Sequence, residues 1–137
     1  MTLEEKDRVV LIKYRIEKAK KAAEDACFLI DNNRLLLAVN RIYYGAFYIL
    51  SALALKYQVP TSKHKELIGW FNKTFVKTSI IPRKYGQFVH KAFDKRSKAD
   101  YADYVEFDKK EVSIMFNEMK DFIEEVELLI DTPAVKL

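Results

Sequence analysis

The scarcity of turn-forming residues is the feature that most limits how this sequence can fold. Only three glycines and three prolines occur in 137 residues. Small β-sandwiches and doubly wound α/β domains need such residues at regular intervals, because glycine and proline adopt the backbone angles of tight turns. We therefore expect long helices joined by few connections.

Apolar residues recur at helical spacing in five segments. The first is expected to run from about residue 3 to Asp31, where Asn32 and Asn33 tolerate the left-handed backbone that ends a helix. The second, residues 34–57, is apolar almost all round, as expected of a helix covered on several sides. Further segments begin near residues 61, 82 and 108, but the periodicity fails between residues 97 and 104.

These segments predict an all-α fold, an up-and-down bundle of four or five helices. We expect a single domain over residues 1–131, followed by a short tail over residues 132–137. The lone Cys27 has no partner for an internal disulfide and is expected to be a small buried side chain. With no apolar export signal at the N-terminus, and Asn40 and Arg41 interrupting the most apolar segment, we expect a cytoplasmic protein without a membrane partner.

Charge is distributed unevenly along the chain. Residues 61–98 carry ten Lys or Arg and two Asp or Glu, a net charge of +8, whereas residues 99–131 carry three and eleven, a net charge of −8. The basic stretch predicts a surface for phosphate or another acidic partner. The alternative is that the acidic last helix packs beside the basic stretch and neutralises it.

Metal and cofactor chemistry are not indicated by the residues present. The histidines, His64 and His90, and Cys27 do not lie at the spacing of metal ligands. No glycine-rich phosphate loop occurs, so we expect no metal and no cofactor, and any bound nucleotide would be held by side chains.

Arg41 lies in the middle of the apolar second segment, where an unpaired guanidinium would be strongly destabilising. It is expected either to form a buried ion pair with another helix or to bind phosphate at the floor of a groove. Tyr44 shares its side of the helix, whereas Tyr43 and Phe47 are expected to fill the core.

His64 is flanked by Lys63 and Lys65 near the expected start of the third helix. The neighbouring cations and the positive end of the helix dipole favour its neutral form, which could accept a proton. Lys63 and Lys65 are candidate phosphate ligands, while a surface histidine without a role is the alternative interpretation of His64.

Polar residues gather where the helical period fails, in the sequence KRSKADYADY. Arg96 and Lys98 are candidates for phosphate contacts, and Tyr101 and Tyr104 could stack on bases. Asp100 belongs to the same candidate binding set. The alternative is a solvated loop in which Arg96 pairs with Asp100.

Three stretches in this order, NRIYYGAFYIL, TSKHKELIGWFNKTFV and KRSKADYADY, resemble the HEPN domain over roughly residues 25–130. They are similar to the small stand-alone HEPN proteins, which have a tyrosine pair in the second helix, Lys-His at the third and Arg-x-x-x-Asp-Tyr after the fourth. The resemblance implies a helical bundle that forms a homodimer with a positively charged cleft. It also implies toxin activity, often as a metal-independent ribonuclease, and a nucleotidyltransferase partner that acts as antitoxin.

The chain departs from the ribonuclease signature of that family, which is an arginine followed after four to six residues by histidine. Arg96 matches the arginine, but no histidine follows it, and Asp100 and Tyr101 stand four and five residues on. His64, from another helix, would have to take the histidine's role, with Tyr101 assisting.

Three hypotheses follow for the function. The first is an HEPN protein that binds nucleotide or RNA through a basic cleft, as one component of a toxin–antitoxin pair with a nucleotidyltransferase. The second is an active metal-independent endoribonuclease toxin. The third is a non-catalytic module whose basic stretch docks an acidic protein. A homodimer is expected in any case, because nine phenylalanines, eight tyrosines and a tryptophan exceed what one small core readily hides.

Overall fold

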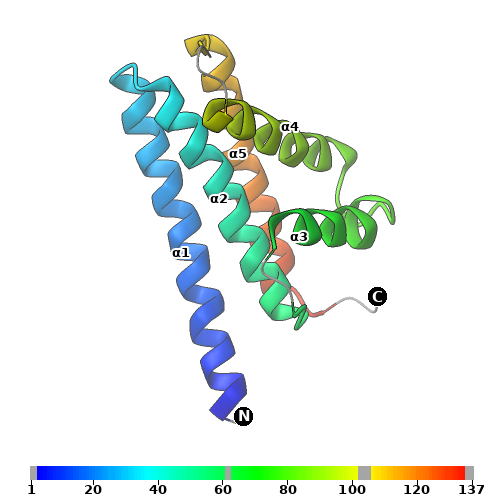
Figure 1. Cartoon of the computed structure of the whole chain (residues 1–137). Coiled ribbons are helices and arrows are strands. Elements are labelled where there is room, and N and C mark those ends of the chain that lie inside the picture. The colour runs from blue at the N-terminus through cyan, green and yellow to red at the C-terminus, as the bar shows by residue number, and fades with distance from the viewer. Residues whose placement is uncertain (1–2, 61–62, 102–105, 135–137) are drawn as a thin grey trace.

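The computed structural model describes residues 3–60, 63–101 and 106–134. This part of the chain is all-α, as predicted, with α1 (Leu3–Asp31), α2 (Leu35–Lys56), α3 (His64–Phe71), α4 (Arg83–Tyr101) and α5 (Lys109–Asp131). A π-helical turn, Asn72–Val76, extends α3. In Figure 1, α1, α2 and α5 form the long axis of the bundle, and α3 and α4 cross that axis on the side of α2 opposite α1.

The core is organised around α2, which contacts α1, α3, α4 and α5. Its packing against α1 is close because the facing side chains of α1 are small, Ala19, Ala22 and Ala26 being at most 2% exposed. At Gly45 a β-carbon would come within 2.8 Å of Met119 Sδ on α5. Glycine therefore lets α2 approach α5 closely at this level of the bundle.

The ends of the long helices are held by local chemistry. Asn33 adopts the left-handed conformation, with φ of 57°, immediately after α1. Asp108 caps α5 by accepting a hydrogen bond from the backbone N–H of Lys110. At the other end of α5, the Lys56 ammonium donates to the carbonyl oxygens of Leu129, Ile130 and Thr132. A cation at this end complements the negative pole of the helix dipole and ties α5 to α2.

Two expectations from the sequence are wrong. Residues 97–101 are helical, since α4 continues to Tyr101. Ion pairs one turn apart, Asp94 with Lys98 and Arg96 with Asp100, support this last part of the helix although its apolar period fails. Cys27 is exposed instead of buried, because it lies on the outer face of α1.

The acidic last helix neutralises part of the basic stretch. Lys91 and Lys95 of α4 form ion pairs with Glu118 and Glu111 of α5. For these two lysines, the acidic last helix therefore packs beside the basic stretch and neutralises its charge, which is the alternative interpretation of the charge pattern.

By length and composition, α2 is also the one described helix that could cross a membrane. Within its most apolar window, 56% of the residues are buried inside the bundle. Its hydropathy is therefore that of a core helix.

Candidate functional site

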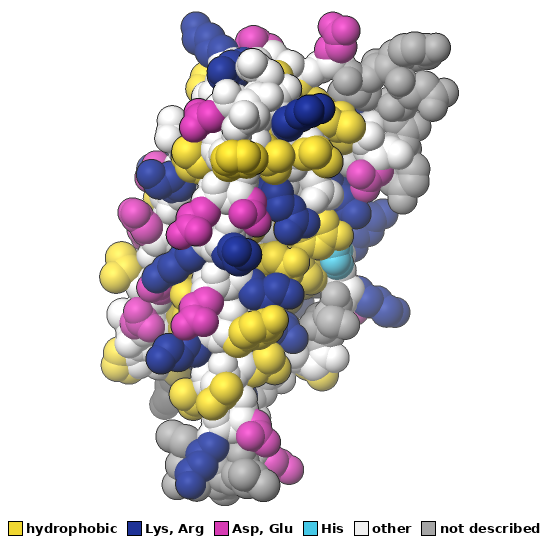
Figure 2. All heavy atoms as spheres, turned by 90° about the vertical axis from the view of Figure 1, so that its left-hand side faces the viewer, with side chains coloured by type: hydrophobic (Ala, Val, Ile, Leu, Met, Phe, Trp, Pro, Cys, Tyr) yellow, Lys and Arg dark blue, Asp and Glu magenta, His cyan; other side chains and the backbone are white. Residues whose placement is uncertain are grey.

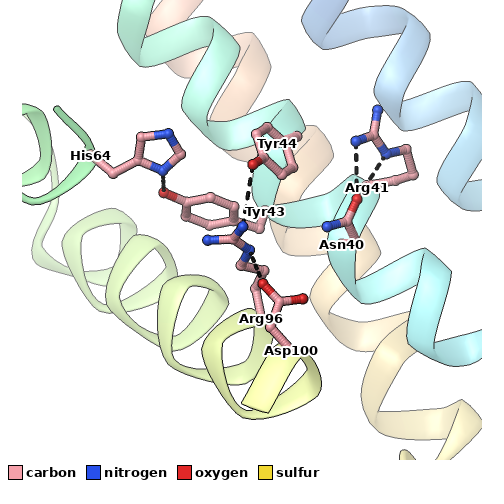
Figure 3. Close-up of polar contacts among 7 residues, drawn as sticks. All are labelled: Asn40, Arg41, Tyr43, Tyr44, His64, Arg96 and Asp100. Carbon is pink, nitrogen blue, oxygen red and sulfur yellow. Dashed lines mark hydrogen bonds and ion pairs between the residues drawn. The ribbon is translucent and has the colours of Figure 1, made fainter. Parts of the chain in front are cut away.

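Five side chains from three helices meet at one place on the bundle, and we call them the arginine–tyrosine cluster. It comprises Tyr43 and Tyr44 of α2, His64 of α3, and Arg96 and Asp100 of α4. Figure 3 shows the Arg96 side chain reaching from α4 toward both tyrosines, with His64 on the far side of Tyr43. The crossing of α3 and α4 over α2 brings these distant parts of the sequence together.

Arg96 occupies the centre of the cluster. Its guanidinium carbon lies 5.4 Å from the ring centroids of both Tyr43 and Tyr44, within the range of cation–π attraction. Nη2 donates a hydrogen bond to the Tyr44 hydroxyl at 3.3 Å, and Nε lies 2.9 Å from Asp100 Oδ2. The Nε atom is buried and its N–H makes no well-directed hydrogen bond in the described structure, so charge attraction holds the Arg96–Asp100 pair. The side chain remains 24% exposed, so the bundle does not fully enclose Arg96.

The Tyr43 hydroxyl and His64 Nδ1 are 2.6 Å apart. The imidazole also stacks on the Phe47 ring, with centroids 3.9 Å apart and planes inclined by 24°. Burial raises the pKa of Tyr43 to about 12, against the opposing effect of Arg96. Tyr43 therefore keeps its proton at neutral pH, and its ring is part of the core as the sequence predicted, although its hydroxyl belongs to the site.

His64 is neutral at pH 7. Its pKa lies below the usual 6.5, first because burial disfavours the charged imidazolium and second because the Arg96 charge repels it. The direction of this shift confirms the prediction from sequence, but the causes are burial and Arg96 instead of Lys63 and Lys65.

The bond to Tyr43 decides what the other ring nitrogen of His64 can do. If the phenol donates to Nδ1, the neutral ring carries its proton on Nε2 and can donate to a phosphate oxygen. If Nδ1–H donates to the phenol oxygen, Nε2 has a free lone pair and can accept a proton. In the described part of the chain Nε2 has no hydrogen-bond partner, so either form can meet a ligand.

Arg41 extends the cluster on the other side of Tyr44. Its guanidinium carbon lies 5.2 Å from the Tyr44 ring centroid, and two of its nitrogens donate to Asn40 Oδ1 at 3.0 and 3.2 Å. The buried ion pair considered from the sequence is not formed with any described residue. Arg41 needs no carboxylate because the N-terminal part of α2 is partly exposed, as the 56% exposed Leu37 shows.

The remaining candidate residues lie at the surface or outside the described residues. Lys63 and Lys65 are exposed, with Lys63 Nζ 4.0 Å from Glu66. Lys98 is exposed and pairs with Asp94 at 3.2 Å. The Tyr101 side chain and the whole of Tyr104 lie outside the described residues, so their expected stacking roles stay predictions.

A groove of about 490 Å³ lies between α1 and α2, and His64 lines one part of it. Its lining also contains cations that the charge count along the sequence did not single out. Its walls include Tyr14, Arg15 and Lys18 from α1 and Tyr48 from α2. Figure 2 shows the α1 face, where dark blue cations lie among yellow apolar and magenta acidic side chains. Tyr14 and Lys18 stand four residues apart, a spacing that would have placed them on one helix face.

Among the residues that the structure describes, no three His, Cys, Asp or Glu side chains come close enough together to hold a metal ion. The groups available for chemistry here are therefore the guanidiniums, the imidazole and the phenols of the cluster.

The lowered pKa of His64 gives a testable dependence of stability on pH. The unfolded chain takes up a proton on His64 near pH 6.5, while the folded chain resists protonation to a lower pH. The unfolded state thus binds more protons in this window, and the free energy of unfolding should fall as the pH drops below 6.5. In urea denaturation between about pH 5 and pH 8, His64→Gln should flatten this dependence, and His90→Gln, at an exposed position of α4, should not. Identical profiles for wild type and His64→Gln would contradict the assignment.

Comparison with known proteins agrees with the resemblance seen in the sequence. The family model described as the HEPN domain matches residues 12–129. A UPF0332 protein of Thermotoga maritima is 36% identical over 129 residues, which cover 94% of this chain and 96% of the relative. A Methanocaldococcus jannaschii protein named "Putative toxin MJ0142" is 32% identical over 108 residues, covering 79% of this chain and 74% of the relative. A second from that organism, "Putative toxin MJ0605", is 31% identical over 111 residues, covering 81% and 82%. The chain belongs to the HEPN domain family.

Proposed function

We propose that this toxin-like HEPN protein binds single-stranded RNA, with a backbone phosphate at Arg96 of the arginine–tyrosine cluster. The observation that carries the proposal is the position of the Arg96 guanidinium, which lies 5.4 Å from the centroids of two tyrosine rings on a side chain that is 24% exposed. The toxin names of two relatives support an activity directed at a cellular target such as RNA.

The geometry suits phosphate because Arg96 is held in place before any ligand arrives. A guanidinium has five N–H donors in a planar fork, and those not directed at Tyr44 or Asp100 remain available for phosphate oxygens. Since the rings and Asp100 already restrict the side chain, binding would cost little further conformational entropy. Arg41, on the other side of the Tyr44 ring, provides a second guanidinium for a neighbouring phosphate.

The half-buried aromatic rings favour RNA over an acidic protein surface. Tyr44 and Tyr48 lie next to each other on α2, with ring centroids 5.8 Å apart. Rings beside cations form a platform on which bases stack while the cations follow the backbone. An acidic protein would use the cations and leave the rings without a role, and that third hypothesis is the contrary outcome of the following test.

Arg96→Ala should weaken the binding of a fluorescein-labelled oligouridylate by ~1.5 to 3 kcal/mol, the usual contribution of a hydrogen bond to a charged group. Arg96→Lys should restore part of the affinity, because it keeps the charge but loses the fork. Fluorescence anisotropy at low salt measures the effect. The matched control is Lys91→Ala, which removes a cation of the same helix that is paired with Glu118. Equal effects of Arg96→Ala and Lys91→Ala would contradict a specific site, and circular dichroism establishes that both variants fold.

Cleavage of the bound RNA is a second candidate function, favoured by the neutral His64 beside Arg96. With Nδ1–H donated to the Tyr43 oxygen, His64 Nε2 would take the proton of a ribose 2′-hydroxyl. The 2′-oxygen would bond to phosphorus as the bond to the 5′-oxygen breaks, with that oxygen taking a proton from water. Arg96 would stabilise the added negative charge on the phosphoryl oxygens.

His64→Ala separates this candidate from binding alone. Under the cleavage mechanism it should lower the rate of cleavage by about 100-fold or more, the usual contribution of a general base, while oligouridylate affinity changes little. Denaturing gel electrophoresis of labelled RNA measures the products, and His90→Ala is the control. If the wild-type protein binds RNA without cleaving it, the cleavage mechanism is wrong and the function of the site is binding alone.

We further propose that the protein is a homodimer that joins through the apolar end of the α1–α2 face. Phe28, Leu36 and Leu37 are 67%, 47% and 56% exposed there, and Leu37 is one helical turn from Arg41. The nucleotidyltransferase partner that the resemblance implies stays a prediction.

Leu37→Glu should convert the dimer to a monomer, because it places two carboxylates in an apolar contact. Sedimentation at micromolar concentration should give twice the 16.1-kDa chain mass for wild type and the chain mass for the variant. Leu128→Glu, at a 62% exposed position of α5, is the control and should remain dimeric. A monomeric wild type would refute the proposal.

A further inference from the structure

The groove between α1 and α2 has the chemical character of a ligand site. Its volume of about 490 Å³ falls within the range of about 300–1,000 Å³ typical of small-molecule sites. The described residues that line it include two cations, Arg15 and Lys18, and no carboxylate. The two positive charges would attract an anion, repel a cation and interact weakly with an uncharged molecule, so the groove favours an anionic ligand.

The two cations are also free of the pairing seen elsewhere on α1. Lys20, two residues beyond Lys18, lies 2.8 Å from Glu127 of α5. Neither Arg15 nor Lys18 has a carboxylate partner among the described residues, and both are only partly exposed. Lys18 instead lies over aromatic rings, with Nζ 4.7 Å from the Tyr48 centroid and 5.5 Å from the Tyr14 centroid. A cation–π contact leaves the positive charge uncancelled.

The groove and the arginine–tyrosine cluster are continuous. His64 lines the groove and bonds Tyr43 of the cluster, while Tyr48 lines the groove and packs beside Tyr44. A chain molecule with a phosphate at Arg96 would therefore need to pass only these shared residues to enter the groove.

We infer that this groove is a second nucleotide subsite, which holds the base and phosphate of the RNA residue adjacent to the one bound at Arg96. This subsite rests on the proposed function, because its ligand is the nucleotide next to the one bound at Arg96. The base packs against the Tyr14 and Tyr48 rings, and Arg15 and Lys18 contact the phosphate. The subsite recognises any base, because stacking needs only a π-face and the walls offer no base-specific set of donors and acceptors.

Salt dependence gives a test that is specific to charge. Binding of fluorescein-labelled octauridylate should weaken with salt, and each lost phosphate contact should reduce the log–log slope by about 0.7. Arg15→Ala combined with Lys18→Ala, which removes both cations from that phosphate, should reduce the slope by about this amount, and Lys18→Ala alone should reduce it by part of this amount. Lys20→Ala, which removes a cation of the same helix paired with Glu127, should leave the slope unchanged. Equal slopes for Lys18→Ala, Lys20→Ala and wild type would overturn the subsite.

The loss of a ring tests the base contact separately. Tyr14→Leu keeps an apolar side chain at a position 54% exposed, and should weaken octauridylate binding by about five- to 150-fold, the range for one lost base stack. Tyr14→Phe, which keeps the ring, is the matched control and should bind octauridylate as wild type does.

The failures of the two proposals can be told apart. If Arg96→Ala weakens octauridylate binding while Lys18→Ala and Tyr14→Leu do not, RNA binding stands and the second subsite is wrong. If wild type does not bind octauridylate, both proposals are wrong. If Tyr14→Leu leaves RNA affinity unchanged but lowers the sedimenting mass to that of one chain, the groove is covered by a second copy and the subsite is overturned.

Discussion

The burial of α2 is the constraint on which the position of every site residue depends. Because α2 packs against α1, α3, α4 and α5, the positions of α3 and α4 over α2 are fixed by the core. Tyr43 has its ring in this core and its hydroxyl at the edge, where the first residue of α3, His64, meets it. The same burial raises the pKa of Tyr43 and lowers that of His64, so packing sets both the geometry and the protonation state of the pair.

The basic residues of this protein fall into two groups that differ in what they contact. On the α5 side, Lys20, Lys91 and Lys95 form ion pairs with carboxylates, which cancel their charge. On the α1–α2 side, Lys18 and Arg41 lie over tyrosine rings, which hold a cation in place without cancelling it. Lys18 and Arg41 therefore keep more of their positive charge, although a count along the sequence assigns the excess of cations mainly to residues 61–98.

Helical periodicity was sufficient to predict the all-α bundle, because apolar residues at helical spacing mark the buried face of each long helix. It placed α1 and α5 to within a residue or two and anticipated the left-handed Asn33. It failed after Arg96, where the helix is stabilised by ion pairs one turn apart and not by apolar contacts.

The candidate site was only partly predictable from the sequence. Arg96, Tyr44 and His64 were identified one by one, but their proximity depends on how α3 and α4 cross α2, which no local pattern encodes. Tyr43 was assigned to the core alone, because a pattern cannot show that the hydroxyl of a buried ring hydrogen-bonds to a histidine of another helix. Arg96 differs from Arg41 because Asp100 offsets part of the Arg96 charge, whereas Arg41, on the other side of the Tyr44 ring, has no such acid among the described residues. Under the proposed function, a phosphate bound at Arg96 would offset the effect of the Arg96 charge on His64. Proton uptake by His64 would therefore become easier once that phosphate is bound.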